Sequence, residues 1–295
     1  MNEVDKFLDY LLSDRGYSML TVKTYQAALT SFCIFYRSLD ALLTWQSVDA
    51  DVVRLWMAAE VRRGDDARTI SKKLSALRSF YKYLLRTNRI EKNPMSRIRN
   101  PKVSVKLPTF LRQQEVDRLF DDLTYSDDYM GMRDYAILQT FYHTGIRLSE
   151  LIGLNIADVS IIRSELKVTG KRNKQRIIPF GKELTEVLQR YEKYRETLED
   201  IADKDALFLS KKKKRITISQ VETLVKTYLS QATNQKKKSP HVLRHTFATA
   251  MLNNGADLEA IKELLGHESV VTTEIYTHVT FDDLKKQYKL AHPRA

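Results

Sequence analysis

The segment SPHVLRHTFATAMLNNGADLEAIKELLGHESVVTTEIYTH, residues 239–278, gathers side chains that can move protons or bind anions. Its candidates are His241, Arg244, His245, His267, Tyr276 and His278. Histidine exchanges a proton near neutral pH, arginine offers phosphate a planar fork of donors, and tyrosine can act as a nucleophile. The segment could therefore hold a metal site, a nucleophile with helper groups, or packed structural side chains.

The pair His241 and His245 tests the metal hypothesis. Four residues apart on a helix, the two rings share one face, as the ligands of an HExxH zinc site do. Residue 242 is valine, however, so the glutamate of that motif is missing, and Arg244 would place a fixed positive charge beside the metal. The sequence supplies no cluster of cysteine or acidic ligands nearby, and it therefore predicts no metal and no cofactor.

A phosphate suits His241 and Arg244 better. Ser239 fits an N-cap and Pro240 the first helical position, so the helix is expected to begin about His241. The unpaired N–H groups and positive dipole of a helix N-terminus favour an anion. His241 and Arg244 are three residues apart and share a helix face. Taken alone, such an H-x-x-R pair is a weak signal.

The whole chain must position these residues, and its composition points to a polyanionic partner. The 295 residues carry a net charge of +12 at pH 7, and the length favours two domains. No long basic amphipathic anchor is evident, which favours nucleic acid over a membrane. Basic residues exceed acidic ones in both halves, which suits two domains that both touch a phosphate backbone. A merely soluble basic protein is the alternative. Cys33 is expected to be a buried thiol, and the acidic N-terminal stretch is unlike a signal peptide, so we expect a cytoplasmic protein.

Residues 1–98 show the apolar spacing of helices, and their last helical segment adds a basic face. The candidate DNA contacts on this face are Lys72, Arg78 and Lys82, and an ordinary solvated face is the alternative. The stretch 99–109, which includes Lys102, is rich in proline and basic residues and predicts an extended linker. We therefore predict a helical DNA-binding domain at 1–98, a linker at 99–109 and a second domain at 110–295.

The second domain is predicted to be mainly helical with a small β-hairpin. The hairpin strands, Glu165–Thr169 and Gln175–Phe180, flank the polar turn Gly170–Lys174. A short helix capped by Ser269 is expected to carry Tyr276. The other helices are expected at about 112–123, 129–143, 182–197, 219–233, 241–255 and 258–265.

Further motifs place the candidate residues in a specific order. HTGIRLSELIGL sets Arg147 between a glycine helix stop and a new helix, TGKRNKQRIIPFG sets Lys171 on the hairpin, and LLGHES and TTEIYTH add His267 and Tyr276. With these motifs the chain resembles the tyrosine recombinase (phage integrase) family, most closely its Xer-type bacterial members, over almost its entire length. The resemblance implies a SAM-like core-binding domain followed by a mixed, mostly α catalytic domain.

The resemblance also implies a role for each residue. Tyr276 would attack a DNA phosphodiester, form a 3′-phosphotyrosyl link and release a 5′-hydroxyl. Arg147 and Arg244 would bind the non-bridging oxygens and offset charge in the transition state. Glu150 would orient Arg147. His241 would handle the proton of the tyrosine.

Lys171, by the same resemblance, would be the general acid for the leaving 5′-oxygen, and His267 would hydrogen-bond the phosphate. Arg172 stands where the family commonly has glycine, which leaves Lys174 as an alternative general acid. Arg172 and Lys174 are also candidate DNA contacts. His245 is expected to be a packed structural histidine.

Assembly follows from the same resemblance, because recombination needs four strand cuts. We expect a homo- or hetero-tetramer on double-stranded DNA with inverted-repeat half-sites, in which a C-terminal helix at 281–290 docks into the next protomer. Packing of that helix on its own domain is the alternative. Chromosome dimer resolution in the bacterial cytoplasm, at the nucleoid, is the expected role. The alternatives are a transposon or phage integrase, a non-cutting DNA-binding protein, a metal-dependent nuclease and a type IB topoisomerase.

Overall fold

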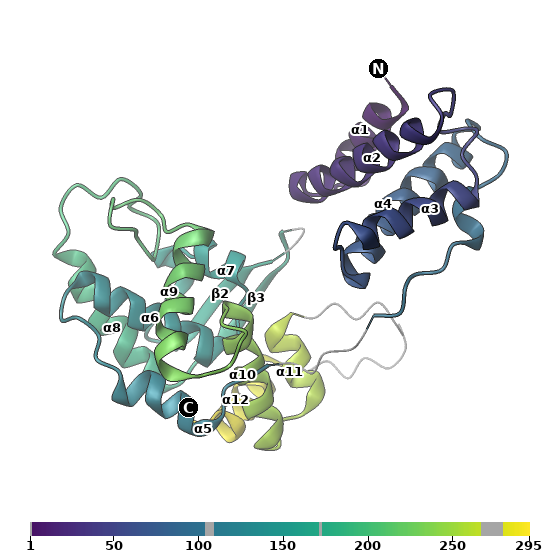
Figure 1. Cartoon of the computed structure of the whole chain (residues 1–295). Helices are drawn as coiled ribbons and strands as arrows, with labels where there is room; N and C mark the ends of the chain where they lie inside the picture. The colour runs from purple at the N-terminus through teal and green to yellow at the C-terminus, as the bar shows by residue number, and fades with distance from the viewer. Residues whose placement is uncertain (1, 104–108, 171–172, 267–279) are drawn as a thin grey trace. The chain divides into compact units, whose positions relative to one another are not determined.

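A computed structural model of the protein describes residues 2–103, 109–170, 173–266 and 280–295. The chain divides into two compact units, Met1–Lys106 and Leu107–Ala295. Both units are mainly helical, and the described strands form one small sheet in the second unit (Figure 1), so the predicted fold class is confirmed. Among the described residues, no helix is long and apolar enough to cross a membrane.

The N-terminal unit is built from helices with side-chain caps. The N-cap residues whose side chains accept a hydrogen bond from a first-turn N–H are Asn2, Ser18, Asp49 and Asp66. The elements are α1 (Glu3–Ser13), α2 (Met19–Leu39), α3 (Ala50–Arg62), α4 (Ala67–Arg86) and the 3-10 helix η1 (Pro94–Arg97).

An aromatic core holds this unit together. Phe32 and Trp56 are fully buried and meet edge to face at 5.2 Å between ring centroids, and Trp45 meets Phe80 in the same way at 4.7 Å. Such edge-to-face pairs stabilise a core beyond the burial of their area. Phe80 comes from the apolar face of α4, so the opposite face of that helix is left to solvent.

The second unit combines further helices with the sheet. Its elements are α5 (Gln113–Asp117), the π-helical turn η2 (Arg118–Asp122), α6 (Tyr129–Thr144), α7 (Leu148–Gly153), η3 (Ile156–Asp158), β1 (Val159–Ser160), β2 (Glu165–Thr169), β3 (Gln175–Pro179), α8 (Lys182–Glu196), α9 (Ile218–Ala232), α10 (Pro240–Asn253), α11 (Leu258–Leu265) and α12 (Phe281–Ala291). The described strands lie in the order β1-β2-β3, and each pair is antiparallel.

The helix α6 forms the centre of this unit and positions the first candidate arginine. It is buried along most of its length and packs against α8 and α10. It ends at Gly145, whose φ of 57° lies in the left-handed region. A Cβ atom at Gly145 would lie 2.5 Å from Cδ1 of Phe247, so backbone conformation and space both require glycine. The chain then turns directly into Arg147.

The hairpin predicted from the sequence is present. Thr169 pairs with Gln175, and the N–H of Gly170 donates to the carbonyl of Lys174 at 2.8 Å. Val168 pairs with Arg176 farther along the strands. The remaining strand, β1, has two residues, and a strand this short shows no alternating pattern from which it could be predicted.

The helix expected at 112–123 is interrupted. The α-helical part, α5, is followed by the wider turn η2, a rare conformation that apolar spacing does not distinguish from a regular helix. Asp117 and Asp121, at the ends of α5 and η2, both form ion pairs with Arg294 beyond α12.

The last helix, α12, packs on its own unit. Leu284, Tyr288 and Ala291 are buried, and the helix contacts α10, α11 and β3. Figure 1 shows it beside α10 and α11. In this structure the C-terminal helix therefore adopts the arrangement that the sequence analysis held as the alternative to docking on another protomer.

Candidate active site

The structure describes part of the predicted catalytic set. Arg147, His241 and Arg244 lie within the described residues, as does Glu150. The other predicted residues, Lys171, Arg172, His267 and Tyr276, lie outside them, together with His278 and the short helix expected to carry Tyr276.

Arg147 occupies the N-cap position of α7 and is tied to Glu150 in the same helix. Its backbone N–H donates to Oε2 of Glu150 at 2.7 Å, and Nη1 donates to Oε1 at 2.8 Å. Nη2 donates to the carbonyl of Gly266 at 2.6 Å. The arginine side chain is 32% exposed, whereas that of Glu150 is 1% exposed. Arg147 is therefore held in place and still accessible to a ligand.

Arg244 lies deeper, on α10. Its guanidinium donates to the carbonyl of Gly145 and, at 2.7 Å, to the carbonyl of Leu265. Burial, and then the nearby charge of Arg147, lowers the pKa of Arg244 to about 10. Arg244 thus remains a cation at neutral pH while carrying an electrostatic cost that an added anion would relieve.

A third arginine, Arg176 on β3, joins the site although sequence reasoning assigned it no role. Nη1 and Nη2 donate to the two oxygens of Glu150 at 2.7 and 3.0 Å, and Nε donates to the carbonyl of Leu264 at 2.9 Å. One signal was present in the sequence. Gln175 and Ile177 face solvent on this strand, so alternation turns Arg176 inward, where a charged side chain needs partners.

The three arginines meet at the C-terminal end of α11. The carbonyls of Leu264, Leu265 and Gly266 each accept a hydrogen bond from a different arginine. Carbonyls at a helix C-terminus lack partners within the helix and form its negative end, so cations stabilise them. The helix ends at Gly266 with a left-handed φ of 62°. The cluster thereby fixes the backbone immediately before position 267.

We call Arg147, Arg176, Arg244 and Glu150 the arginine cluster. Burial by itself would raise the pKa of Glu150, but the hydrogen bonds from Arg176 and Arg147 outweigh it and leave the pKa below its ordinary value. Glu150 is therefore ionised, and one carboxylate faces three guanidinium groups. The surplus positive charge suits an anion such as a phosphodiester.

His241 lies in the first turn of α10, and Arg244 lies three residues after it. The predicted N-cap, Ser239, is in place but makes no side-chain cap bond, and its Oγ finds no hydrogen-bond partner among the described residues. His241 is exposed, and partial burial, then the charges of Lys237 and Arg244, lowers its pKa. The ring is therefore neutral at pH 7 and can accept a proton.

His245, one helical turn after His241, is half-buried. Burial and the charge of Lys237 lower its pKa as well. Its expected structural role remains a prediction.

The residues predicted to contact DNA are mostly open to solvent where they are described. Lys72, Lys82, Lys102 and Lys174 are exposed. Arg78 is half-buried, and its guanidinium donates to the carbonyl of Ile98 at 2.9 Å and to Oδ1 of Asn100 at 2.7 Å. Arg78 therefore also has a structural use, since it secures the chain that follows η1.

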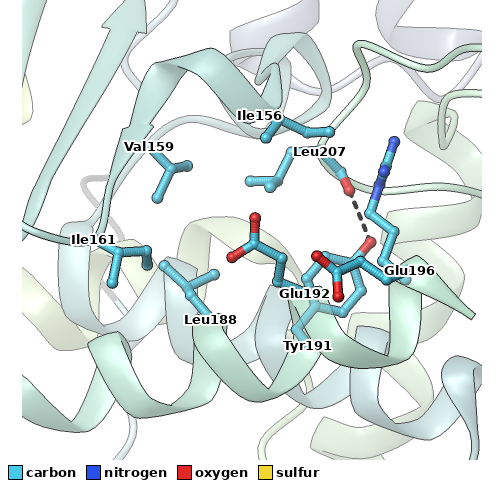
Figure 2. Close-up of a pocket in the computed structure, with 9 residues that line it drawn as sticks. Ile156, Val159, Ile161, Leu188, Tyr191, Glu192, Glu196 and Leu207 are labelled. Carbon is cyan, nitrogen blue, oxygen red and sulfur yellow. Dashed lines mark hydrogen bonds between the residues drawn. The ribbon is translucent and has the colours of Figure 1, made fainter.

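A pocket elsewhere in the second unit has the wrong chemistry for phosphate. Its lining residues, most of which Figure 2 labels, are Ile156, Val159, Ile161, Leu188, Tyr191, Glu192, Arg195, Glu196 and Leu207. Tyr191 donates to the carbonyl of Leu207 at 2.7 Å, the hydrogen bond drawn in Figure 2. The wall is largely apolar and carries two acidic side chains, and its one arginine, Arg195, donates to the carbonyls of Lys204 and Ala206. None of the lining residues belongs to the arginine cluster.

Two family models match the chain. The model described as Phage integrase family matches residues 109–283. The model described as Phage integrase, N-terminal SAM-like domain matches residues 4–88. Together they span both compact units.

Curated relatives align over nearly the full length of both chains. The chain is 40% identical over 318 residues to the tyrosine recombinase XerC of Chlorobaculum tepidum, covering 98% of this chain and 94% of that relative. It is 38% identical over 297 residues to the tyrosine recombinase XerC of Bacillus subtilis, covering 100% of this chain and 97% of that relative.

Solved structures share the fold. A XerH site-specific recombinase bound to its difH substrate in a pre-cleavage complex matches with a TM-score of 0.71 and 24% identity, covering 96% of this chain and 83% of that chain. The Tn1549 transposon integrase in complex with transposon right end DNA matches with a TM-score of 0.73 and 20% identity, covering 98% and 99%. At these identities the likeness concerns the fold alone.

Proposed function

We propose how this chain, which belongs to the phage integrase family and is a site-specific tyrosine recombinase, cuts and rejoins double-stranded DNA. The family and the activity expected from the order of the motifs are thereby confirmed, and the roles of single residues are the proposal. Tyr276 is the nucleophile. Its phenolic oxygen forms a bond to the scissile phosphorus as the bond from phosphorus to the 5′-oxygen breaks. Because a phenolate leaves more readily than an alkoxide, a 5′-hydroxyl can later reverse the step.

The arginine cluster carries the proposal. Arg147 and Arg244 bind the non-bridging oxygens of the phosphate and stabilise the charge that develops on them. Arg147 is accessible, Arg244 is buried and electrostatically strained, and the cluster holds one carboxylate for three guanidinium groups. This surplus of positive charge, held rigidly by protein carbonyls, is the observation that favours a phosphate at this place.

The remaining groups move protons or hold the phosphate. His241, with its lowered pKa, accepts the proton of the Tyr276 hydroxyl, and Lys171 donates a proton to the departing 5′-oxygen. Lys174, which is exposed in the same hairpin turn, is the alternative donor. His267 hydrogen-bonds the phosphate. Gly266, the described residue before it in the sequence, accepts a hydrogen bond from Arg147.

Assembly on DNA is the next part of the proposal. Residues 1–98 form the DNA-binding domain, 99–109 the linker and 110–295 the catalytic domain, and four protomers gather on two inverted-repeat sites. The buried face of α12 would dock on the neighbouring protomer in the same way that it packs on its own unit here. DNA as the partner is supported by the similar structures that were solved in complex with DNA. The proposed contacts to the phosphate backbone of the DNA are Lys72, Arg78, Lys82, Lys102, Arg172 and Lys174.

The biological role that we propose is chromosome dimer resolution in the bacterial cytoplasm, at the nucleoid, supported by the similarity to relatives named XerC. Integration of a mobile element is the alternative role. The DNA site that the protein protects distinguishes the two, because the first predicts a single chromosomal inverted-repeat site and the second predicts the ends of an element.

A nicked suicide substrate built on the protected site tests the reaction. We expect a covalent protein–DNA adduct with the wild-type protein and none with Tyr276→Phe, while DNA binding is retained, because phenylalanine lacks only the hydroxyl. EDTA is expected to leave the adduct unchanged. Adduct formation by Tyr276→Phe would move the nucleophile to another residue, and loss of cleavage in EDTA would favour the metal-dependent nuclease.

A further inference from the structure

Arg176 is the member of the arginine cluster to which the proposed reaction gives no role. It lies on β3, opposite Val168, and its side chain is 12% exposed. It occupies both oxygens of Glu150 and the carbonyl of Leu264, so one side chain joins β3 to α7 and to the end of α11. Burial of an arginine at such a junction is costly unless all of its contacts are made.

We propose that Arg176 is a positioning residue for strand cleavage: it holds the carboxylate of Glu150 and the end of α11 so that Arg147 presents its guanidinium to the phosphate. The inference deepens the proposed function, because it depends on Arg147 as a phosphate ligand. Arg176 itself is placed in contact with protein groups, and its effect on the reaction passes through Arg147.

The competition for Glu150 supports this inference. The carboxylate receives the backbone N–H and Nη1 of Arg147 in addition to the two donors of Arg176. If Arg176 were absent, Glu150 would face Arg147 alone, and a carboxylate and a guanidinium pair most favourably through two parallel hydrogen bonds. The Nη2 group of Arg147 would then leave the carbonyl of Gly266 and donate to Glu150 instead. Because Arg176 also binds the carboxylate, Glu150 forms fewer hydrogen bonds to the guanidinium of Arg147 than it would form alone.

The end of α11 gives a second line of support. A Cβ atom on Gly266 would lie 3.0 Å from Nη1 of Arg176, so the guanidinium packs directly against the glycine backbone. Arg176 donates to the carbonyl of Leu264, and Arg147 donates to that of Gly266 two residues later. Both arginines thus set the position of one short stretch of backbone, and a shift in Arg176 is transmitted to the acceptor that orients Arg147.

A purely structural ion pair is the competing explanation, and Arg215 provides a matched control. Its Nε donates to Asp203 at 3.0 Å, its Nη1 donates to the carbonyls of Ile152 and Leu154 at 3.0 and 2.9 Å, and its Nη2 donates to Asn155 at 2.7 Å. Arg215 is therefore also a partly buried arginine that joins a carboxylate to backbone carbonyls in the same unit. None of these partners belongs to the arginine cluster.

The experiment compares Arg176→Gln, Arg176→Lys and Arg215→Gln in the full-length protein by single-turnover cleavage of the suicide substrate. One substrate carries an ordinary scissile phosphate and the other a methylphosphonate, in which a methyl group replaces a charged non-bridging oxygen. The neutral group needs less stabilisation from Arg147. DNA affinity and thermal stability are measured for each variant.

We expect Arg176→Gln to lower the cleavage rate on phosphate about 10- to 100-fold, because a small misplacement of a phosphate ligand costs about that much. On methylphosphonate we expect the loss to shrink to about a third of its value or less, for Arg176→Gln as for Arg147→Ala, because less negative charge develops on the neutral group. DNA affinity stays within about twofold, and Arg215→Gln shows the same small loss on both substrates. Arg176→Lys keeps the charge but not the fork, so its loss on phosphate is smaller and also shrinks on methylphosphonate.

Equal losses by Arg176→Gln on the two substrates, or no loss beyond that of Arg215→Gln, would overturn the positioning role. If Arg176→Gln does not fold, the same comparison is read from Arg176→Lys. Failure of the proposed function has a different signature, because the wild-type protein would then form no adduct, or Arg147→Ala would cleave phosphate as fast as the wild type.

Discussion

Two clusters of charged residues in the second unit use arginine in opposite proportions. The arginine cluster holds three guanidinium groups and one carboxylate, that of Glu150, which contacts Arg147 and Arg176 and interacts with Arg244 through its charge. At the C-terminus, one guanidinium, that of Arg294, contacts three carboxylates, those of Asp117, Asp121 and Glu183, and we call these four residues the tail cluster. The first cluster has positive charge to spare, and the second has none.

The difference indicates what each cluster is suited to bind. The surplus charge of the arginine cluster is held by carbonyls, which leaves its net charge available to an incoming anion. In the tail cluster burial by itself would lower the pKa of Arg294, but the hydrogen bonds that its guanidinium donates to Asp121 and Glu183 outweigh burial and raise the pKa above its ordinary value, so its charge is used within the protein. We infer that the first cluster serves phosphate and the second secures the chain after α12.

The largest expected effect separates the two clusters in cleavage. Arg244→Ala should lower single-turnover cleavage of the nicked suicide substrate about 100- to 1,000-fold, the usual cost of removing one charge-stabilising donor. Arg294→Ala should change that rate less than about threefold, because its partners are protein carboxylates. The measurement is the rate of adduct formation at saturating protein. A comparable loss in both variants would abolish the distinction between the clusters.

Much of this architecture could be predicted from local sequence. The apolar spacing and the cap residues predicted most helices, and Gly145 and Gly266 predicted where α6 and α11 end, since both adopt the left-handed backbone. The π-helical turn η2 could not be predicted, because its apolar positions also fit a regular helix. The two residues of β1 were too few to show a period.

The site was predicted in its residue types and less well in its connections. The motif order selected Arg147, Glu150 and Arg244, which the structure gathers at the end of α11. Arg176 was missed because its partners, Glu150 and Leu264, lie 26 and 88 positions away in the sequence. A pattern of spacing reports which face a residue turns inward, but it does not report which distant group meets it there.

The second prediction compares the carboxylates of the two clusters in stability. Glu150→Gln should lower the free energy of unfolding of the second unit by about 3 kcal/mol, because Glu150 is 1% exposed and its loss leaves buried guanidinium groups uncompensated. Glu183→Gln should cost less than about 1 kcal/mol, because Glu183 is 31% exposed and Arg294 keeps two other carboxylates. Urea unfolding of the full chain measures both. Equal costs would show that burial does not distinguish the clusters.

The smallest effect concerns pH and rests on His292, beside the tail cluster. Its Nδ1 lies 3.2 Å from the backbone nitrogen of Arg294, and its Nε2 lies 3.3 Å from the carbonyl oxygen of Tyr142. A neutral ring with its proton on Nε2 makes both hydrogen bonds, whereas a second proton on Nδ1 would remove the first. Burial lowers the pKa of His292 from 6.5 to about 4. His143, which stacks on this ring, has its pKa lowered by burial and by His292.

The lowered pKa of His292 decides in which direction the docking of α12 changes with pH. Above pH 6.5 the ring is neutral whether α12 is docked or released, so its contribution to docking is complete. As the pH falls from 6.5 toward about 4, the released ring takes up a proton more readily than the docked ring, and docking weakens. Between about pH 7 and about pH 5.5 the loss should be about 1 kcal/mol for His292 alone. Hydrogen exchange of the α12 amides, corrected for intrinsic rates, should show this loss, and His292→Gln should reduce the change.

Amides of α11 at the arginine cluster should keep their protection over this range, because the pKa of Glu150 lies below its ordinary value of 4.5. Parallel losses in α11 and α12 would mean that the whole unit responds to pH, and would contradict an effect of His292 on the docking of α12.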